Sequence, residues 1–433
     1  MKIIDTNLNF EIEKFKKPLG FKGKFLTGSW QVVSYLESED NFSIGLGTQS
    51  VLWSDSNVFS ENSESGGNAL MFVVTQYALR LLKGREIKNP VEMLEEIFQD
   101  VHNYAKKITG RNDLKETFTL NSLVSVDNAL WILYAKENNK LNFFEMIPEE
   151  YKEYFKYRHK KISCIPLISY VVSIEEIERM VNEGFFVLKI KIGSDPDNDG
   201  DREKMLKWDM ERIKIIHEKF KNYECQYTKN GKLPYYFDAN GRYDKKERLL
   251  KLIDFIDKIG ALEQVIIIEE PFPEEIEIDI SDIPLRIVAD ESAHTDKNVI
   301  ERNQMGYKGV ALKPIAKTLS MTLKILKEAE NRNMDYFCAD LTVTPIVCEW
   351  NKIFSSGIKT FSELKIQIVE SNGFQYYKNW EKILKYHPYY GENWIIPLNG
   401  TFNLNDKFYR VSGGIFETSE HYKKLVVQKK EWK

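Results

Sequence analysis

The chain has 433 residues, 42% of them hydrophobic, and a formal net charge of −4. This length favours more than one structural unit, and the charge gives no electrostatic reason to expect nucleic acid or an anionic membrane as a partner. The N-terminus is charged, no apolar run is long enough to span a bilayer, and the four cysteines form no CxxC pair. We therefore expect a cytoplasmic protein without a disulfide framework or a zinc ribbon.

The first 160 residues predict an α+β domain. Two alternating runs, WQVVSYLES and FSIGLGTQS with EDN between them, predict an antiparallel hairpin within residues 24–49. The polar segment 54–68 is typical of an exposed loop. Apolar residues at helical spacing then predict helices over 69–82, 90–109 and 117–135. Strands followed by helices indicate an α+β arrangement.

From residue 166 onward, strand-like runs alternate with helical segments. Ser173 and Glu176 form a capping-box signature that predicts the start of the first of these helices. Near-continuous apolar strands indicate a parallel sheet buried on both faces, and eight such units predict a TIM-type barrel. An open doubly wound sheet would need a glycine-rich phosphate turn after an early strand, and the chain has none. The eight strand candidates are PLISYVV, FVLKIKI, YYFDAN, VIIIEEP, RIVADES, GVALKP, YFCADLT and KIQIVES.

One of these units is enlarged by residues 194–234, which include the acidic run SDPDNDGD. The run lacks the spacing and the terminal Glu of an EF-hand calcium loop. We expect an exposed acidic turn that caps the next helix.

Three consecutive strands end in carboxylates, at Asp238, Glu269 and Asp290. The last residues of adjacent barrel strands converge on one axis, so these carboxylates can face a common point. Three oxygen ligands without His or Cys suit Mg²⁺ and leave positions for water and substrate. The pattern predicts a magnesium site at this end of the barrel.

Lysines lie on both sides of the three acids: Lys189 and Lys191 end the preceding strand, and Lys313 ends the following one. A lysine beside another cation and a metal can lose its proton and act as a base. A substrate carboxylate on the metal would lie between Lys191 and Lys313, which could reach opposite faces of its α-carbon. The alternative is a structural network of lysines and carboxylates.

These motifs resemble the muconate-lactonizing-enzyme branch of the enolase superfamily. The branch carries K-x-K, D-x-N, E-[EQ]-P, D-E-S and Lys on successive strands. The chain has Lys189-Ile-Lys191, Asp238-Ala-Asn240, Glu269-Glu270-Pro271, Asp290-Glu291-Ser292 and Lys313. In addition, SVDNALWILYAK and WIIPLNGTFNL are similar to the end of the family's N-terminal domain and to its returning tail.

The resemblance implies a (β/α)7β barrel over 161–385, an α+β capping domain over 1–160, and a segment 386–433 that returns to this domain. It implies one Mg²⁺, with Mn²⁺ as an alternative ion, on Asp238, Glu269 and Asp290. It also implies Lys191 and Lys313 as the acid/base pair, with Lys189 as an electrostatic neighbour. Residues expected to hydrogen-bond within the site or to contact substrate are Asn240, Glu291, Asp340, Glu370 and Trp53.

The chain also departs from some relatives. Strand seven offers no histidine, which disfavours the Asp/His dyad of the mandelate-racemase branch, and His294 is expected on a surface loop. Dipeptide epimerases carry Asp-x-Asp after strand eight to hold the substrate ammonium, whereas this chain has Glu370-Ser371-Asn372. Glu370 and Asp340 remain candidates for binding a cationic group. Residues 21–25 and 49–55, the latter with Trp53, are expected to close over the substrate.

Three functions follow from this resemblance. The first is racemisation or epimerisation of an amino-acid derivative or dipeptide, through α-proton abstraction and a metal-stabilised enediolate. The second is a one-base β-elimination or cycloisomerisation, as in succinylbenzoate synthase or muconate cycloisomerase. The third is a metal-binding scaffold without catalysis. The expected partner is a small-molecule carboxylate, and relatives that form dimers or larger assemblies imply a homo-oligomer.

Overall fold

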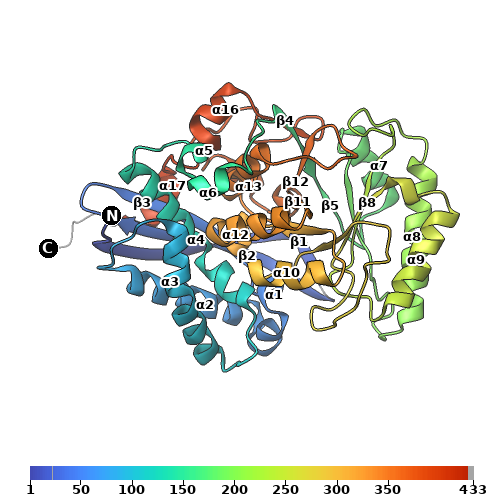
Figure 1. The fold of residues 1–433 in the computed structure, drawn as a ribbon, viewed down its shortest axis with the longest axis horizontal. Coiled ribbons are helices and arrows are strands. Elements are labelled where there is room, and N and C mark those ends of the chain that lie inside the picture. Colours follow the sequence, from blue (N-terminus) through green and yellow to red (C-terminus); the bar gives the residue numbers. More distant parts are fainter. Residues whose placement is uncertain (22, 428–433) are drawn as a thin grey trace.

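The computed structural model describes residues 1–21 and 23–427 (Figure 1). It begins with a three-stranded antiparallel sheet in the order β1-β2-β3. The predicted hairpin is confirmed, since Trp30 pairs with Gln49 and Glu37 with Phe42. The sequence did not predict the first strand, an edge strand whose charged side chains are mostly exposed. The strands are β1 (Asp5–Phe21), β2 (Lys24–Glu37) and β3 (Phe42–Gln49).

Helices cover one side of this sheet, and the fourth of them packs directly against β3. A Cβ added at Gly45 would lie 2.0 Å from the carbonyl oxygen of Ser125, so only glycine allows this close approach. The helix against β3 is buried from Thr117 to Leu133. The first helices are α1 (Val51–Ser54), α2 (Ser56–Leu82), α3 (Pro90–Thr109), α4 (Glu116–Glu137), α5 (Phe143–Met146) and α6 (Glu149–Lys152).

The expectation of a loop over residues 54–68 was wrong, because this segment is helical. Asp55 caps α2 by accepting hydrogen bonds from the backbone N–H groups of Asn57 and Val58. A kink at Ser63, where φ is 66°, interrupts the helix. The segment is polar because much of it faces solvent, and its burial at both ends supplies the packing that holds it in a helix.

The second sheet closes into a barrel, as predicted. Its order is β13-β4-β12-β11-β10-β9-β8-β7-β6-β5. β4 pairs with β12 and β5 pairs with β6, and only Pro166 separates β4 from β5, so one interrupted strand closes the ring. The ring contains β4 (Lys161–Ile165), β5 (Leu167–Ile168), β6 (Leu188–Lys191), β7 (Tyr235–Asp238), β8 (Val265–Glu269), β9 (Ile287–Ala289), β10 (Gly309–Leu312), β11 (Asp335–Cys338) and β12 (Gln367–Glu370).

The first barrel strand therefore begins and ends earlier than the predicted run 166–172. The capping box of Ser173 and Glu176 is confirmed, and Asp201 of the acidic turn caps α8 by accepting from two backbone N–H groups. The elements between the strands are α7 (Ile174–Asn182), α8 (Arg202–Phe220), α9 (Lys246–Lys258), η1 (Leu262–Gln264), α10 (Asp296–Gln304), α11 (Pro314–Lys317), α12 (Leu319–Asn331) and α13 (Pro345–Gly357).

The last segment touches both sheets. β13 (Thr401–Asn403) pairs antiparallel with β4, while Asn7 and Asn9 of β1 donate side-chain hydrogen bonds to carbonyls near the end of α17. We keep 1–160, 161–385 and 386–433 as a proposed division into domains. The remaining helices are α14 (Gly373–Tyr376), α15 (Trp380–Leu384), α16 (Asp406–Val411), η2 (Ser412–Gly414) and α17 (Glu420–Val426).

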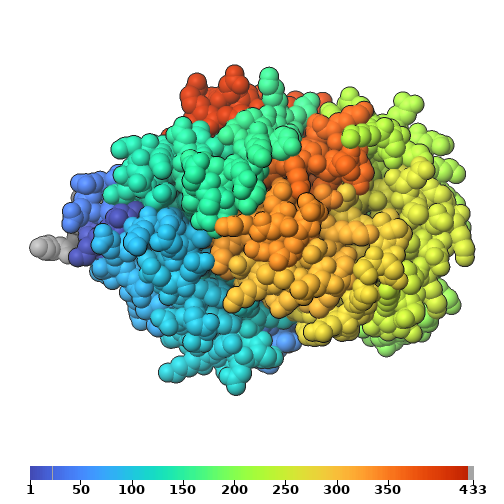
Figure 2. Space-filling view, in the orientation of Figure 1, coloured from blue at the N-terminus to red at the C-terminus, as the bar shows by residue number. Residues whose placement is uncertain are grey.

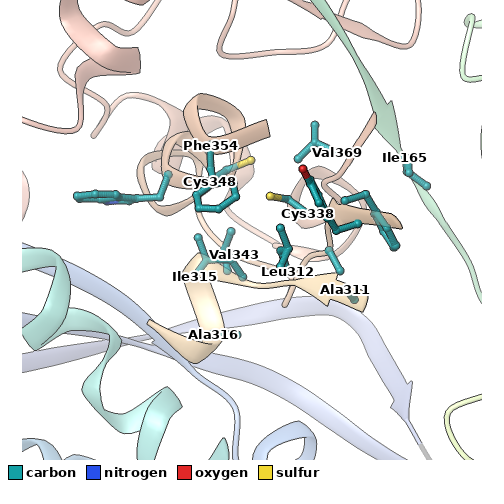
Figure 3. Packing of buried hydrophobic residues seen from close by; sticks show 14 of the residues in the cluster. Ile165, Ala311, Leu312, Ile315, Ala316, Cys338, Val343, Cys348, Phe354 and Val369 are labelled. Carbon is teal, nitrogen blue, oxygen red and sulfur yellow. The ribbon is translucent and has the colours of Figure 1, made fainter. Parts of the chain in front are cut away.

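The two sheets and their helices form one packed body. Figure 2 shows the N-terminal helices, in blue and cyan, directly against the orange helices of the barrel, with the red C-terminal segment above them. Figure 3 shows part of the core, where Leu312, Val343 and Val369 lie around Cys338 and Cys348. All four cysteines are buried and free. Among the described residues, no helix has the length and apolar character needed to cross a membrane.

Candidate active site

The predicted charged residues meet at the carboxyl ends of the barrel strands. Strand register places Lys191 opposite Asp238 and Asp238 opposite Glu269, so three neighbouring strands end at one level. Asp290 follows β9 directly and is 1% exposed, while Asp238 and Glu269 are fully buried. The barrel thus places the predicted acids together in its interior.

The carboxylates leave oxygen atoms available. Neither oxygen of Glu269 nor Oδ1 of Asp290 accepts a hydrogen bond from the part of the chain that the structure describes. One oxygen from each of Glu269, Asp290 and Glu291 lies within 4.8 Å of the others. Buried carboxylate oxygens without donors are costly unless a cation binds them. Their number and their chemistry fit a hard divalent cation such as Mg²⁺.

Asp238 is not one of these three residues, but Lys189 connects it to Glu269, and Lys191 contacts it as well. Lys189 Nζ lies 3.0 Å from Asp238 Oδ2, 3.2 Å from Glu269 Oε2 and 3.0 Å from Glu370 Oε2. Lys191 Nζ lies 2.6 Å from Asp238 Oδ2 and also donates to Asn240 Oδ1. Burial acts to lower the pKa of Lys189, but the surrounding carboxylates outweigh it and raise that pKa well above its usual value. Lys189 is therefore a fixed positive charge at the base of the site.

Lys313 lies at the other end of the row of acids. Its Nζ is 2.5 Å from Asp290 Oδ2 and 4.4 Å from the centre of the Trp53 ring. Burial opposes ionisation of Asp290, but Lys313 and Lys317 together lower its pKa. For Glu269, burial raises the pKa well above the usual range, although Lys189 acts in the opposite direction.

Lys317 was not predicted from the sequence. It is fully buried one helical turn after Lys313, and its Nζ donates to the carbonyls of Asp290 and Ala293 at 2.7 and 2.9 Å. These bonds hold the loop after β9 in place. The spacing of four residues from Lys313 is the only sequence signal, and spacing alone does not show whether a lysine is buried.

The two glutamates of the E-E-P motif have different surroundings. Glu270 has a positive φ of 40°, and its Oε2 accepts from the backbone of Asp290 and from the backbone and hydroxyl of Ser292. Asn240 also has a positive φ, of 44°, and donates from Nδ2 to Glu291 Oε1 at 3.1 Å. These contacts fix the backbone around the acids.

Asp340 and Glu370 form a second acidic pair, after β11 and at the end of β12. Glu370 Oε2 accepts from Lys189 and from the backbone N–H of Asp340. Asp340 accepts backbone hydrogen bonds from Asn372 at 2.8 Å and from Val343 at 3.4 Å. Burial, together with the charge of Glu370, raises the pKa of Asp340 to about 7.

A cavity lies above these groups. Its polar wall is formed by the strand ends, and the N-terminal sheet with α1 supplies its upper wall. Trp53 is 8% exposed, and its Nε1 has no hydrogen-bond partner among the described residues. The apolar side chains that line the cavity are Phe15, Leu19, Phe21, Leu26, Trp53, Leu167 and Leu341.

His294 lies at an interface rather than on a surface loop, so that expectation was wrong. Only 15% of its side chain is exposed. Its Nδ1 lies 3.0 Å from Thr117 Oγ1 of α4, and its Nε2 lies 2.8 Å from Glu274 Oε2. Burial, with Lys317 and Lys115 nearby, lowers the pKa of His294 to about 4. The neutral ring thus joins the loop after β9 to the N-terminal domain.

No protein-family model and no curated protein matches the chain, but solved structures do. A mandelate racemase/muconate lactonizing protein from Herpetosiphon aurantiacus superposes with a TM-score of 0.64 at 13% identity, over 94% of this chain and 96% of that chain. The chain has the fold of the enolase superfamily.

Two further structures have the same fold. A dipeptide epimerase from Enterococcus faecalis, in complex with Mg and L-Leu-L-Tyr, has a TM-score of 0.60 and 15% identity over 86% of this chain and 90% of that chain. A muconate lactonizing enzyme from Mycobacterium smegmatis, in complex with muconolactone, has a TM-score of 0.62 and 15% identity over 94% and 95%.

Proposed function

We propose that the protein is an isomerase that removes the α-proton of a carboxylate substrate with the help of Mg²⁺ and returns a proton to the opposite face. One observation carries this proposal: Lys191 and Lys313 lie at opposite ends of one row of buried carboxylates, and both line the same cavity. The epimerases among the proteins of the same fold support the reaction class. The substrate would be an amino-acid derivative or a dipeptide.

The metal would be held by Asp238, Glu269 and Asp290, with a further oxygen from Glu291. The buried oxygens of Glu269 and Asp290 that accept no hydrogen bond from the described residues are the observation that fits such a group. When bound, Mg²⁺ supplies positive charge that stabilises the negative charge developing on the substrate carboxylate as the α-proton leaves. Lys189 adds a second, permanent positive charge below it.

The lysines move the proton. Lys191, as a neutral amine, would take the α-proton from one face, and Lys313, as an ammonium, would deliver a proton to the other face. The opposite enantiomer would react in the reverse direction, with the two roles exchanged. The cover formed by Phe21 and Trp53 keeps the reacting carbon away from bulk water.

Deuterium exchange tests this proposal. In D₂O with Mg²⁺, a library of dipeptides and N-acyl amino acids should include a substrate that gains deuterium at the α-carbon in both enantiomers. Lys191→Ala and Lys313→Ala should each slow inversion at least about a hundredfold. Each variant should still exchange the one enantiomer that faces its remaining lysine, as chiral chromatography and mass spectrometry would show.

The control is Lys207→Ala, at an exposed position of α8, which should retain full activity. Inversion at an undiminished rate in Lys313→Ala, together with its loss in Lys191→Ala, would contradict the two-base mechanism. Absence of exchange with every carboxylate tested would contradict the proposed function as a whole.

A second candidate is a one-base elimination or cycloisomerisation. The contact of Lys313 with the Trp53 ring and with Asp290 favours it, because both neighbours stabilise the ammonium form. Lys313 would then hold a negative charge on the substrate instead of transferring a proton. Lys313→Arg separates the two candidates: it should retain activity in the one-base reaction and lose inversion in the two-base reaction.

A further inference from the structure

The two lysines assigned to proton transfer are held by different kinds of contact. Lys313 directly precedes α11, and its carbonyl accepts from the backbone N–H groups of Ala316 and Lys317, so the first turn of a helix fixes it. Lys191 is the last residue of β6, and the chain that follows it is a loop. The position of Lys191 therefore depends on what holds this loop.

Strand pairing holds only the beginning of the loop. β7 pairs with β6 as far as Lys191, which lies opposite Asp238, and the next backbone N–H, that of Ile192, donates to the carbonyl of Asp238 at 2.9 Å. On the other side of β6, β5 is two residues long, and within the described residues its pairing stops at Ile190. Beyond Ile192, the chain depends on side chains for its position.

Asp209 of α8 provides a contact of this kind. Its side chain is fully buried, and the N–H of Gly193 donates to its Oδ1 and Oδ2 at 2.9 and 2.8 Å. The hydroxyl of Tyr243, in the loop after β7, donates to Asp209 Oδ2 at 2.7 Å. Burial raises the pKa of Asp209 to about 7, while these hydrogen bonds act to lower it. One carboxyl group thus connects the loop after Lys191 to the loop after Asp238.

Gly193 has little room to move. Its φ is 84°, and a Cβ added at this position would lie 2.4 Å from Cβ of Arg242. Arg242 Nε donates to the carbonyl of Gly193 at 3.2 Å, and the hydroxyl of Tyr170 donates to the carbonyl of Ile192 at 3.1 Å. Side chains thus bind the carbonyl of Ile192 and both backbone polar groups of Gly193.

We propose that Asp209 is a positioning residue, which keeps the amine of Lys191 at the reacting face of the substrate without touching the substrate. The inference rests on the proposed function, since it gives Asp209 a role in the same reaction. A displacement of about 1 Å at a reacting group can reduce the rate about a hundredfold. Because Lys313 is held by α11 instead, loss of Asp209 should impair only one of the two proton transfers.

Deuterium exchange at the α-carbon of each enantiomer measures the two proton transfers separately. The enantiomer whose exchange is lost in Lys191→Ala is the one that faces Lys191. At saturating concentration of this enantiomer, Asp209→Ala should slow exchange about thirtyfold or more, and exchange of the other enantiomer should stay within about threefold. KM should change little, because Asp209 is not among the described residues that line the cavity.

Asp209→Asn is the conservative variant. Its amide oxygen can accept from the same backbone N–H, and its N–H₂ can donate to the Tyr243 hydroxyl, so it should exchange the enantiomer that faces Lys191 at least about tenfold faster than Asp209→Ala. Tyr243→Phe removes one donor and should slow the same exchange about threefold. The matched control is Tyr235→Phe, which removes a buried hydroxyl that contacts His217 and should slow neither enantiomer.

Backbone hydrogen exchange, followed by mass spectrometry, tests the same inference without turnover. Asp209→Ala should speed exchange at least about tenfold in peptides that cover Gly193 and leave peptides that cover Lys313 unchanged. Unchanged exchange at Gly193 would overturn the inference, and so would α-exchange slowed to the same extent in both enantiomers. Should Asp209→Ala fail to fold, an equal effect of Tyr243→Phe on both enantiomers, or no effect, would overturn it as well.

The two readouts separate this inference from the proposed function. If no carboxylate gains deuterium in the unmodified protein, the proposed function fails, and backbone exchange alone decides whether Asp209 holds the chain at Lys191. If both enantiomers gain deuterium but Asp209→Ala slows neither of them or both of them equally, the proposed function stands and the positioning role fails.

Discussion

The strand ends of the barrel and the N-terminal sheet with its first helices, which we call the cover, lie on opposite sides of the cavity. These two regions hold their side chains by different means. Backbone pairing in a parallel sheet sets the level of Lys191, Asp238 and Glu269. The cover depends on side chains instead: Thr117 Oγ1 donates to the carbonyl of Ser54, and Ser54 Oγ donates to Asn121 Oδ1. Changes in the cover can therefore alter which substrate fits while the reacting groups stay in place.

The largest expected effect comes from the strand ends. Glu269→Gln removes a carboxylate assigned to the metal, so activity should fall at least about a thousandfold. Without Mg²⁺ the stability of the variant should change little, because the neutral amide removes the cost of a buried carboxylate that accepts no hydrogen bond but also removes the ion pair with Lys189.

Thermal unfolding with and without Mg²⁺ measures this effect. Mg²⁺ should raise the melting temperature of the unmodified protein and leave that of Glu269→Gln unchanged. The control is Glu263→Gln, whose side chain is 74% exposed. An equal shift in Glu269→Gln and in the unmodified protein would exclude Glu269 as a ligand.

The barrel could be predicted from the sequence because most of its strands are apolar runs that a charged residue ends or follows. A parallel sheet buried on both faces requires such runs, and the fold brings their ends together. The same reasoning does not identify Lys317, because nothing in the sequence of a short helix distinguishes a buried lysine from an exposed one. Its partners, the carbonyls of Asp290 and Ala293, belong to another unit.

The cover was harder to predict because tertiary contacts define it. β1 is an edge strand rich in Lys and Glu, and these charged residues hide the alternation of apolar and polar residues that predicts a strand. Residues 56–68 have a loop-like composition and form a helix through the Asp55 cap and through packing of Val58 and Asn68. His294 gave no signal because Thr117 and Glu274, its partners, lie far from it in the chain.

The cover should show a smaller effect on binding. Trp53→Phe keeps an aromatic ring near Lys313 but removes the indole N–H, which has no partner among the described residues. If that N–H donates to the substrate, KM should rise about three- to tenfold with little change in kcat. Steady-state kinetics with the best substrate from the exchange screen measures the split.

Trp53→Leu is the companion variant, because it also removes the ring face beside Lys313. It should lower kcat as well as raise KM. A Trp53→Phe enzyme with unchanged KM would show that the indole N–H takes no part in binding.

The smallest expected effect concerns the hydrogen bonds that connect the cover to the barrel. Asp127 of α4 accepts from the hydroxyl and the backbone N–H of Ser320, at the start of α12, at 2.5 and 3.1 Å. Burial raises the pKa of Asp127 to about 7, although these hydrogen bonds act to lower it. In the unfolded chain the pKa of an aspartate is about 3.9. Between about pH 4 and about pH 7, Asp127 is therefore protonated in the folded protein but not in the unfolded chain.

The stability that depends on this proton is therefore present below about pH 4 and is lost as the pH rises to about 7. Asp127→Asn should reduce the decline of the unfolding free energy over that range by up to about 1.4 kcal/mol per pH unit. Urea unfolding at several pH values measures the decline, with the exposed Asp257→Asn as control. If the unfolding free energy of Asp127→Asn fell with pH as steeply as that of the unmodified protein, Asp127 would be charged in the folded protein. The hydrogen bonds from Ser320 would then affect its pKa more than burial does.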